Sequence, residues 1–302
     1  MTTQYAIEGN NITKNLKGFN LDIDDLKVPK GFATALIGEN GAGKTTLLNI
    51  LSGLRLDYKG DITFFGRYSD KEKEDNGNIK NRIGYTGTGK YYLPQWTVRD
   101  IENISKILFE DFSEDRFRKY CDELAIFPHG QLDMKKPNSS FSDGMKVKLM
   151  LAGVLSRDTD MLILDEPASP LDPLMRDKLC QLISEYINNG NGEKSVFFST
   201  HNISDMENIT DYAIIMENGQ IVEQGFVEDL KEKYIVIKGD AADTQKAKDI
   251  LYTITTNPYG FEGICLSENL DKLAGLNVTK EIPTLYQISV AVMKNNTKIV
   301  MR

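Results

Sequence analysis

The amino-acid sequence predicts an α/β protein built on a largely parallel β-sheet. Short apolar runs, such as residues 32–37 and 161–164, alternate with segments that have helical apolar spacing. Strands buried on both faces of a parallel sheet read as continuous apolar runs, and their alternation with helices is typical of α/β folds. A glycine-rich loop at residues 38–43 joins one of these runs to a helix, which indicates a binding loop at the end of a strand.

The composition limits the functions that the 302-residue chain can have. It contains 36 Lys and Arg residues against 44 Asp and Glu residues, which gives a net charge of −8. This balance argues against a nucleic-acid-binding protein, because that function needs a basic surface. Three scattered cysteines and two histidines predict neither a disulfide framework nor a histidine-based metal cluster. Without a signal-peptide pattern or an apolar run of about 20 residues, the sequence predicts a cytoplasmic protein with no membrane span of its own.

The first half of the chain predicts strands and then a helical region. Partial alternation of apolar residues predicts strands within the first forty positions, and residues 45–51 predict a helix. The highly charged segment 69–80 predicts a solvated loop. Thr97 and Asp100 resemble a capping box at the start of a mainly helical region, which ends with a further helix at residues 142–155.

The second half predicts the rest of the sheet, followed by a change of pattern. A helix at residues 173–188 precedes a buried strand at 195–198, and Asn218-Gly219 is a strong hairpin turn signal. Later segments predict strands at 234–237 and 263–266 and helices at 244–252 and 283–293.

We therefore expect two domains with a boundary near residue 230. Residues 1–230 would form the α/β domain, with a helical insert at about 86–155. Residues 231–302 would form a small α+β accessory domain. No internal repeat is visible in the sequence.

The glycine-rich loop carries the strongest chemical signal. The segment Gly38-Glu-Asn-Gly-Ala-Gly43-Lys44-Thr45 fits the pattern G-x-x-x-x-G-K-[ST], between a buried strand and an amphipathic helix. Glycines let backbone N–H groups turn toward phosphates, and the helix adds its N-terminal partial charge. Lys44 can then reach the β- and γ-phosphates, and the hydroxyl of Thr45 can bind Mg²⁺. The expected phosphate-binding residues are Asn40, Gly41, Ala42, Gly43, Lys44, Thr45 and Thr46.

A second glycine–lysine segment, at residues 84–90, does not complete the same pattern. Tyr91 stands where Ser or Thr is required, and Pro94 follows instead of a helix. We expect a plain loop there, and one nucleotide loop in the chain.

The apolar strand at residues 161–164 ends in Asp165 and Glu166. It can bring Asp165 to the edge of the sheet, where its carboxylate would bind Mg²⁺ directly or through water. Glu166 can then polarise a water for attack on the γ-phosphate. An apolar run before Asp-Glu is a weak signal by itself, and it gains weight from the glycine loop.

Further motifs follow in a fixed order. Phe141-Ser142-Asp143-Gly144-Met145 opens a helix, Ser169-Pro170-Leu171-Asp172 follows Glu166, and His201 follows the strand at 195–198. Taken alone, Ser142 would be an N-cap and His201 a packing or capping residue. In this order the segments from about residue 5 to residue 230 resemble the nucleotide-binding domain of the ATP-binding-cassette (ABC) ATPases.

The resemblance implies an ABC P-loop NTPase fold, with an antiparallel β subdomain beside the parallel core, and specific roles for these residues. The glycine loop and the strand ending at Glu166 correspond to Walker A and Walker B, with Glu166 and His201 as catalytic residues. The family signature LSGGQ appears as FSDGM, which keeps Ser142 and Gly144 and has Asp143 and Met145 beside them. Asp172 corresponds to the D-loop aspartate, with Pro170 in place of the usual glycine.

Two positions depart from the family pattern. The adenine-stacking aromatic is replaced by Leu16, and the nearby Phe19 is either a stacking residue or a core residue. The Q-loop glutamine is replaced by Thr88, and Gln95 lies seven residues further on. We expect weaker coupling of this loop to the nucleotide rather than an inactive site.

The resemblance also implies ATP and Mg²⁺ as ligands and a head-to-tail dimer, either a homodimer or a pair with another ATPase subunit. A separate transmembrane permease would hold the dimer at the inner face of the cell membrane and dock between the sheet and the helical insert. The aromatic segment Tyr91, Tyr92, Leu93 and Trp96 would either contact that permease or pack on its own domain.

The C-terminal segment resembles, more loosely, the accessory domain of bacterial exporters of peptides, bacteriocins or antibiotics, including phenol-soluble-modulin and lantibiotic exporters. The expected function is thus ATP-driven export of a peptide or antibiotic-like substrate. The alternatives are a soluble ABC ATPase that acts on a macromolecular partner and a non-hydrolytic nucleotide sensor.

Overall fold

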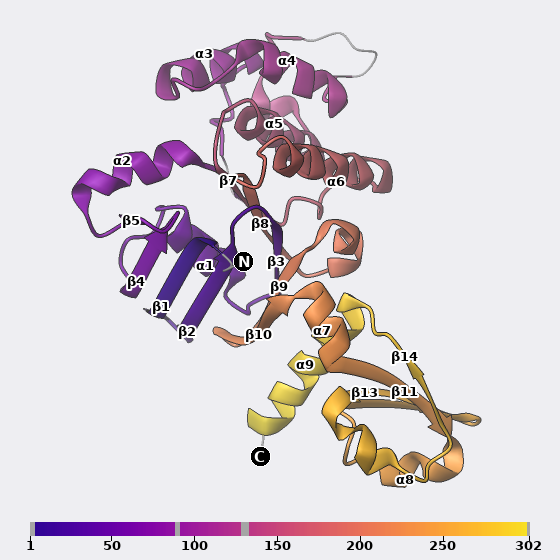
Figure 1. Ribbon diagram of the computed structural model, residues 1–302. Coiled ribbons are helices and arrows are strands. Elements are labelled where there is room, and N and C mark those ends of the chain that lie inside the picture. The colour runs from indigo at the N-terminus through magenta and orange to yellow at the C-terminus, as the bar shows by residue number, and fades with distance from the viewer. Residues whose placement is uncertain (1–3, 88–90, 128–132, 301–302) are drawn as a thin grey trace.

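A six-stranded sheet forms the centre of the molecule in the computed structural model, which describes residues 4–87, 91–127 and 133–300 (Figure 1). Five neighbouring strands are parallel and the edge strand β10 is antiparallel. In spatial order the strands are β10 (Gln220–Phe226), β9 (Tyr212–Glu217), β3 (Ala33–Ile37), β8 (Ser195–Thr200), β7 (Met161–Asp165) and β6 (Ile83–Thr86). The α/β prediction is confirmed.

The central strands send alternate side chains into two apolar cores. Ile163 and Phe197 pack with α1 (Lys44–Leu51) on one face, whereas Leu164 and Phe198 pack with α5 (Asp143–Leu155) and α6 (Pro173–Asn188) on the other. Burial on both faces explains why these strands read as continuous apolar runs.

A four-stranded antiparallel sheet covers the α1 side. Its order is β2 (Phe19–Pro29), β1 (Tyr5–Leu16), β4 (Lys59–Phe64) and β5 (Tyr68–Ser69).

The segment after β5 forms the helix α2 (Lys73–Arg82), so the prediction of a solvated loop over residues 69–80 is wrong for most of that range. Ile79 is its one buried side chain, and the helix has Glu74 and Asp75 in its first turn and Lys80 and Arg82 in its last. These charges complement the helix dipole and stabilise a helix that lacks an apolar stripe.

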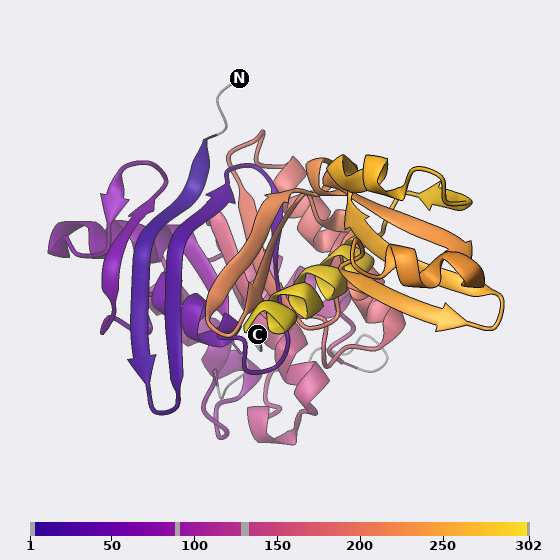
Figure 2. The same ribbon diagram turned by 90° about the horizontal axis from the view of Figure 1, so that it is seen from below.

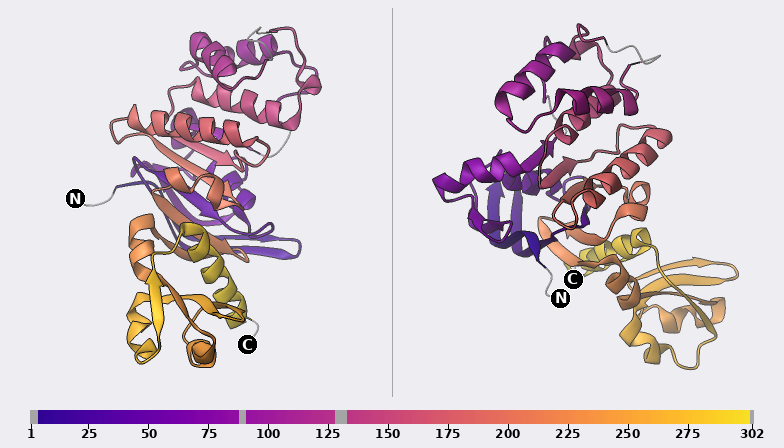
Figure 3. Two further views of the ribbon diagram at one scale, coloured as in Figure 1. Left: turned by 90° about the vertical axis from the view of Figure 1, so that its right-hand side faces the viewer. Right: turned by 45° about the horizontal axis from the view of Figure 1, so that its top comes forward.

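The helical insert lies beyond β6, at the opposite end of the molecule from the C-terminal sheet (Figure 3). It contains α3 (Val98–Leu108), α4 (Glu114–Glu123), the short 3₁₀ turn η2 (Asn138–Ser140) and α5. The expected capping box at the start of α3 is present. The amide of Asp100 donates to the Thr97 hydroxyl (3.2 Å), and the amide of Thr97 donates to the Asp100 carboxylate (2.8 Å).

After α7 (Val227–Lys233) the chain forms a third, antiparallel sheet in the order β12 (Thr253–Asn257), β13 (Gly260–Leu266), β11 (Tyr234–Asp240) and β14 (Val278–Glu281). The helix expected over residues 244–252 is confined to α8 (Thr244–Ala247). Further 3₁₀ turns are η3 (Ile203–Asp205) and η4 (Glu207–Ile209), between β8 and β9, and η5 (Ala241–Asp243) and η6 (Ser267–Leu273), after β11 and β13.

The last helix, α9 (Leu285–Val300), returns to the central sheet and packs along β9, β10 and η3 (Figure 2). Leu285, Ile288 and Val292 are buried in the same core as β7 and β8. Within the described residues, no helix has both the length and the apolarity needed to cross a membrane.

Candidate nucleotide site

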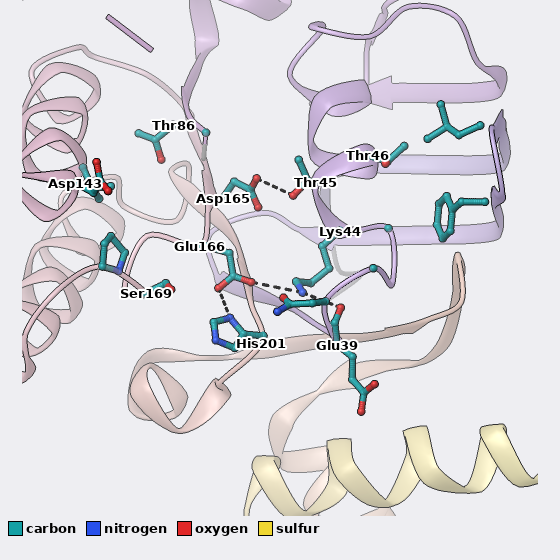
Figure 4. A pocket seen from close by; sticks show the side chains of 18 of the residues that line it. Glu39, Lys44, Thr45, Thr46, Thr86, Asp143, Asp165, Glu166, Ser169 and His201 are labelled. Carbon is teal, nitrogen blue, oxygen red and sulfur yellow. Dashed lines mark hydrogen bonds and ion pairs between the residues drawn. The ribbon is translucent and has the colours of Figure 1, made fainter. Parts of the chain in front are cut away.

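A cavity of about 940 Å³ opens at the carboxyl ends of β3, β7 and β8 (Figure 4). The glycine loop after β3, the residues that end β7 and the residue that follows β8 contribute to its lining. In parallel α/β sheets, ligands bind beyond this edge, because loops from several strands converge there.

The glycine loop wraps around the side chain of Lys44. Gly41 and Gly43 have φ angles of 91° and 105°, which side chains rarely tolerate, so the sequence needs glycine at both positions. The Lys44 ammonium donates to the carbonyls of Gly38 (2.7 Å) and Glu39 (3.2 Å), and only 6% of the side chain is exposed. The loop therefore holds a fixed positive charge at the floor of the cavity.

Thr45 and Asp165 lie together beside Lys44. The Thr45 hydroxyl donates to the Asp165 carboxylate at 2.9 Å, although 119 residues separate the two in sequence (Figure 4). Two oxygen ligands that line this cavity fit Mg²⁺, which usually takes one or two protein ligands and completes its coordination shell with water and phosphate.

The carboxylate of Glu166 lies between the side chains of Lys44 and His201. One carboxylate oxygen is 3.5 Å from the Lys44 ammonium, and the other is 2.7 Å from Nδ1 of His201 (Figure 4). The backbone of Glu166 has a φ of 51°, an uncommon value for a residue with a side chain. Such backbone strain is often found at functional sites.

The signature and D-loop residues have local structural contacts. Ser142 caps α5 by accepting from the amide of Met145 (3.3 Å), and Asp172 caps α6 by accepting from the amide of Met175 (3.1 Å). Asp143 contributes to the lining of the cavity, whereas Ser142, Gly144, Met145 and Asp172 do not. The chain therefore brings the Walker residues and His201 together, but not the whole signature.

The remaining predicted positions differ in their placement. Asn40 and Thr46 contribute to the lining, and Ala42 is buried behind the loop. Phe19 contributes to the lining of the cavity and also packs on the adjacent core, and its stacking on adenine stays a prediction. Thr88 lies outside the described residues.

Sequence reasoning missed Ser199, which contacts both acidic residues. Its hydroxyl donates to Asp165 Oδ1 (2.6 Å) and accepts from the amide of Glu166 (2.9 Å). The available signal was a polar residue near the end of an apolar strand, but only the order of the strands shows what it faces.

This fold and this cavity define a P-loop nucleotide-binding protein. Residues 21–169 match the family model described as "ABC transporter". The chain therefore carries an ABC transporter ATP-binding domain, with the ABC ATPase fold.

The relatives agree with this assignment. The energy-coupling factor transporter ATP-binding protein EcfA2 of Methanospirillum hungatei is 29% identical over 68% of this chain, and the match spans half the length of that relative. The bacitracin transport ATP-binding protein BcrA of Enterococcus faecalis is 29% identical over 83% of this chain and 79% of its own length. Among solved structures, the dimeric ATP-binding cassette MJ0796 in a post-hydrolysis state has a TM-score of 0.61 at 19% identity, over 73% of this chain and 98% of that one.

Proposed function

We propose that this chain is the ATP-hydrolysing subunit of an ABC transporter. The observation that carries the proposal is the convergence of Lys44, Thr45, Asp165, Glu166 and His201 at one edge of the sheet, within hydrogen-bond or ion-pair distance of one another. These residues come from three strand ends, and a merely structural ion pair would not require all of them at the mouth of a large cavity.

Each side chain has a chemical role in this proposal. Lys44 attracts the phosphates of ATP, and Thr45 and Asp165 hold Mg²⁺, which neutralises phosphate charge when it is bound. Glu166 orients and polarises the attacking water. His201, hydrogen-bonded to Glu166 through Nδ1, can present its other ring nitrogen to the γ-phosphate.

The first test is the hydrolysis of ATP by the purified chain and by Glu166→Gln. We expect the substitution to lower kcat by at least about 100-fold, because it removes the general base and its charge, while ATP binding persists. Glu228→Gln is the matched control, since its carboxylate is exposed on α7. Near-normal turnover in Glu166→Gln would contradict the role of Glu166.

We also propose that two copies close over ATP in a head-to-tail dimer. The first turn of α5, with Ser142 and Gly144, would close the partner's cavity, because a helix N-terminus offers hydrogen-bond donors to phosphate oxygens. The dimeric state of MJ0796 supports this arrangement. The Glu166→Gln protein should therefore become dimeric on addition of Mg-ATP in sedimentation experiments, and a persistent monomer would contradict the proposal.

The permease would dock beside the aromatic segment of the helical insert. Tyr92 and Trp96 pack against the main core, whereas Tyr91 and Leu93 are 40% and 48% exposed. Leu93 is therefore the better residue for a test of docking. Leu93→Ser should reduce recovery of the chain in the membrane fraction of its native cells and leave ATP hydrolysis intact. Tyr259→Ser, at a 90% exposed position in the turn between β12 and β13, should change neither.

The proposed cargo is a peptide or antibiotic-like compound that is exported. The name of BcrA, a bacitracin transport protein, supports this substrate class. Chromosomal Glu166→Gln should raise the sensitivity of the native cells to peptide antibiotics. If sensitivity to such compounds is unchanged although ATP hydrolysis is abolished, the proposed substrate class is wrong, whereas the proposed ATPase activity stands.

A further inference from the structure

Ser199 is a fully buried serine at the end of β8, next to the end of β7. The two strands are parallel, and their register sets Ser199 directly beside Asp165. Its hydroxyl donates to Asp165 Oδ1 at 2.6 Å and accepts from the backbone amide of Glu166 at 2.9 Å. One buried hydroxyl thus joins the two acidic residues of the cavity.

The contact with Asp165 determines which carboxylate oxygen faces the cavity. Ser199 engages Oδ1, and Oδ2 is the oxygen that lies 2.9 Å from the Thr45 hydroxyl. A carboxylate fixed at one oxygen has less rotational freedom to lose when the other oxygen binds a cation. Hydrogen bonds of this kind orient metal ligands, and their loss commonly costs about 10- to 100-fold in metal affinity or activity.

The contact with Glu166 acts on the backbone. Glu166 has a φ of 51°, and such a conformation persists only where the surrounding structure holds it. The hydrogen bond from its amide to Ser199 supports this conformation. The conformation in turn places the carboxylate between Lys44 and His201.

We propose that Ser199 is a positioning residue, whose single hydroxyl sets both the rotamer of the Mg²⁺ ligand Asp165 and the backbone of the general base Glu166. This inference rests on the proposed function, since it takes Asp165 and Glu166 to act on Mg-ATP. It extends that function by one residue that touches neither substrate nor metal.

Ser195 supplies a matched control within the same strand. It is also fully buried, and its hydroxyl accepts from the amide of Gly31 at 2.9 Å, at the end of β8 away from the cavity. Ser199→Ala and Ser195→Ala therefore remove the same atom from the same strand, and each leaves one backbone amide without its partner. Ser199→Ala also removes the hydrogen bond to the Asp165 carboxylate, so it should lose more stability than Ser195→Ala.

The test measures Mg²⁺ dependence in the full-length chain with a fluorescent ATP analogue. Ser199→Ala should require about 10-fold more Mg²⁺ for half-maximal Mg-dependent binding, whereas its affinity for the analogue in EDTA should stay within about twofold of the wild type. At saturating Mg-ATP, kcat should fall by about 10-fold, with little change in KM. Ser195→Ala should match the wild type in all these measurements.

Introducing Ser199→Ala into the Glu166→Gln protein separates the effect of the contact with Asp165 from the effect of the contact with Glu166. The Mg²⁺ shift caused by Ser199→Ala should persist there, because it acts through Asp165. An unchanged Mg²⁺ requirement in Ser199→Ala, or an equal shift in Ser195→Ala, would overturn the positioning role while the proposed function stands. If the wild-type chain fails to bind the analogue with Mg²⁺, the proposed function fails and the role of Ser199 fails with it.

Discussion

Lys44 is a nearly buried cation. Its ammonium donates to the backbone carbonyls of Gly38 and Glu39 and lies 3.5 Å from the Glu166 carboxylate. Lys44→Met keeps the length of the side chain and removes the charge. Because hydrogen bonds to charged groups contribute about 1.5–3 kcal/mol, we expect the affinity for ATP to fall by about 10- to 100-fold in a fluorescence titration.

Lys17 is the appropriate comparison, because it is an exposed lysine at the rim of the same cavity. Lys17→Met should weaken binding by less than about threefold, as expected for a solvent-screened charge. Equal losses in the two variants would mean that general electrostatic attraction, rather than the loop around Lys44, binds the nucleotide.

At the scale of single residues, the sequence predicts the functional residues that lie close together in the chain, within one short motif. The glycine loop with Lys44, and Asp165 directly before Glu166, are short motifs whose chemistry follows from residue type. Ser199 could not be found in this way, since its role depends on β8 lying beside β7. The two alternatives for Phe19 also needed the structure, because packing on the core and lining the cavity depend on tertiary contacts.

The hairpin between β9 and β10 contacts the glycine loop through backbone hydrogen bonding. At its turn, the amide of Gly219 donates to the carbonyl of Ala42 (3.0 Å), and its carbonyl accepts from the amide of Asp22 (2.8 Å). Gly219 has a φ of 83°, and a Cβ atom there would lie 1.9 Å from the carbonyl oxygen of Asn20. The turn is thus in contact with both the nucleotide loop and β2.

We expect Gly219→Ala to destabilise the protein and to weaken ATP binding. Gly66→Ala is the control, because Gly66 also has a positive φ (68°) but has open space around it. The control should cost about 1 kcal/mol from backbone strain alone, with normal nucleotide affinity. Gly219→Ala should cost clearly more in urea unfolding, and an equal cost would exclude the contact with Asn20 as its cause.

Two predicted elements differ from the structure, each for its own physical reason. Residues 73–82 form a helix although they carry almost no apolar periodicity, because their charge order and the single buried Ile79 are sufficient. The segment after Thr244 has helical spacing but forms only one turn, because Leu251 packs into the small core below β13 instead. The hairpin and the capping box were predictable because their signals are local.

For the whole molecule, the packing of α9 makes the C-terminal region part of the nucleotide-binding core. Leu285 is fully buried in that core, and its amide donates to the Glu207 carboxylate (2.8 Å) in the segment that follows His201. Residues beyond the expected boundary near residue 230 therefore form a small core of their own, which includes Ile237, Phe261 and Leu273, and also contribute α9 to the central core. The division into two domains stays a prediction. Sequence periodicity shows that α9 has an apolar face, but it cannot show which sheet covers it.

Leu285→Ala should lower the free energy of unfolding by about 2–5 kcal/mol. The single tryptophan, Trp96, lies in the helical insert and packs on the same core, so its fluorescence reports the cassette. The midpoint of its urea transition should fall in Leu285→Ala. Ile282→Ala, three residues earlier and 79% exposed, should change it by less than about 0.5 kcal/mol. An unchanged Trp96 transition in Leu285→Ala would mean that α9 is energetically separate.

The return of α9 has a consequence for biosynthesis. A ribosome delivers β3, β7, β8 and β9 well before residue 285, so the nascent cassette waits for the whole of residues 227–284 before its last apolar face is covered. Nascent domains with uncovered apolar surface are natural clients of chaperones. A polypeptide released before α9 emerges would keep that apolar surface exposed and would be a target for cellular proteases.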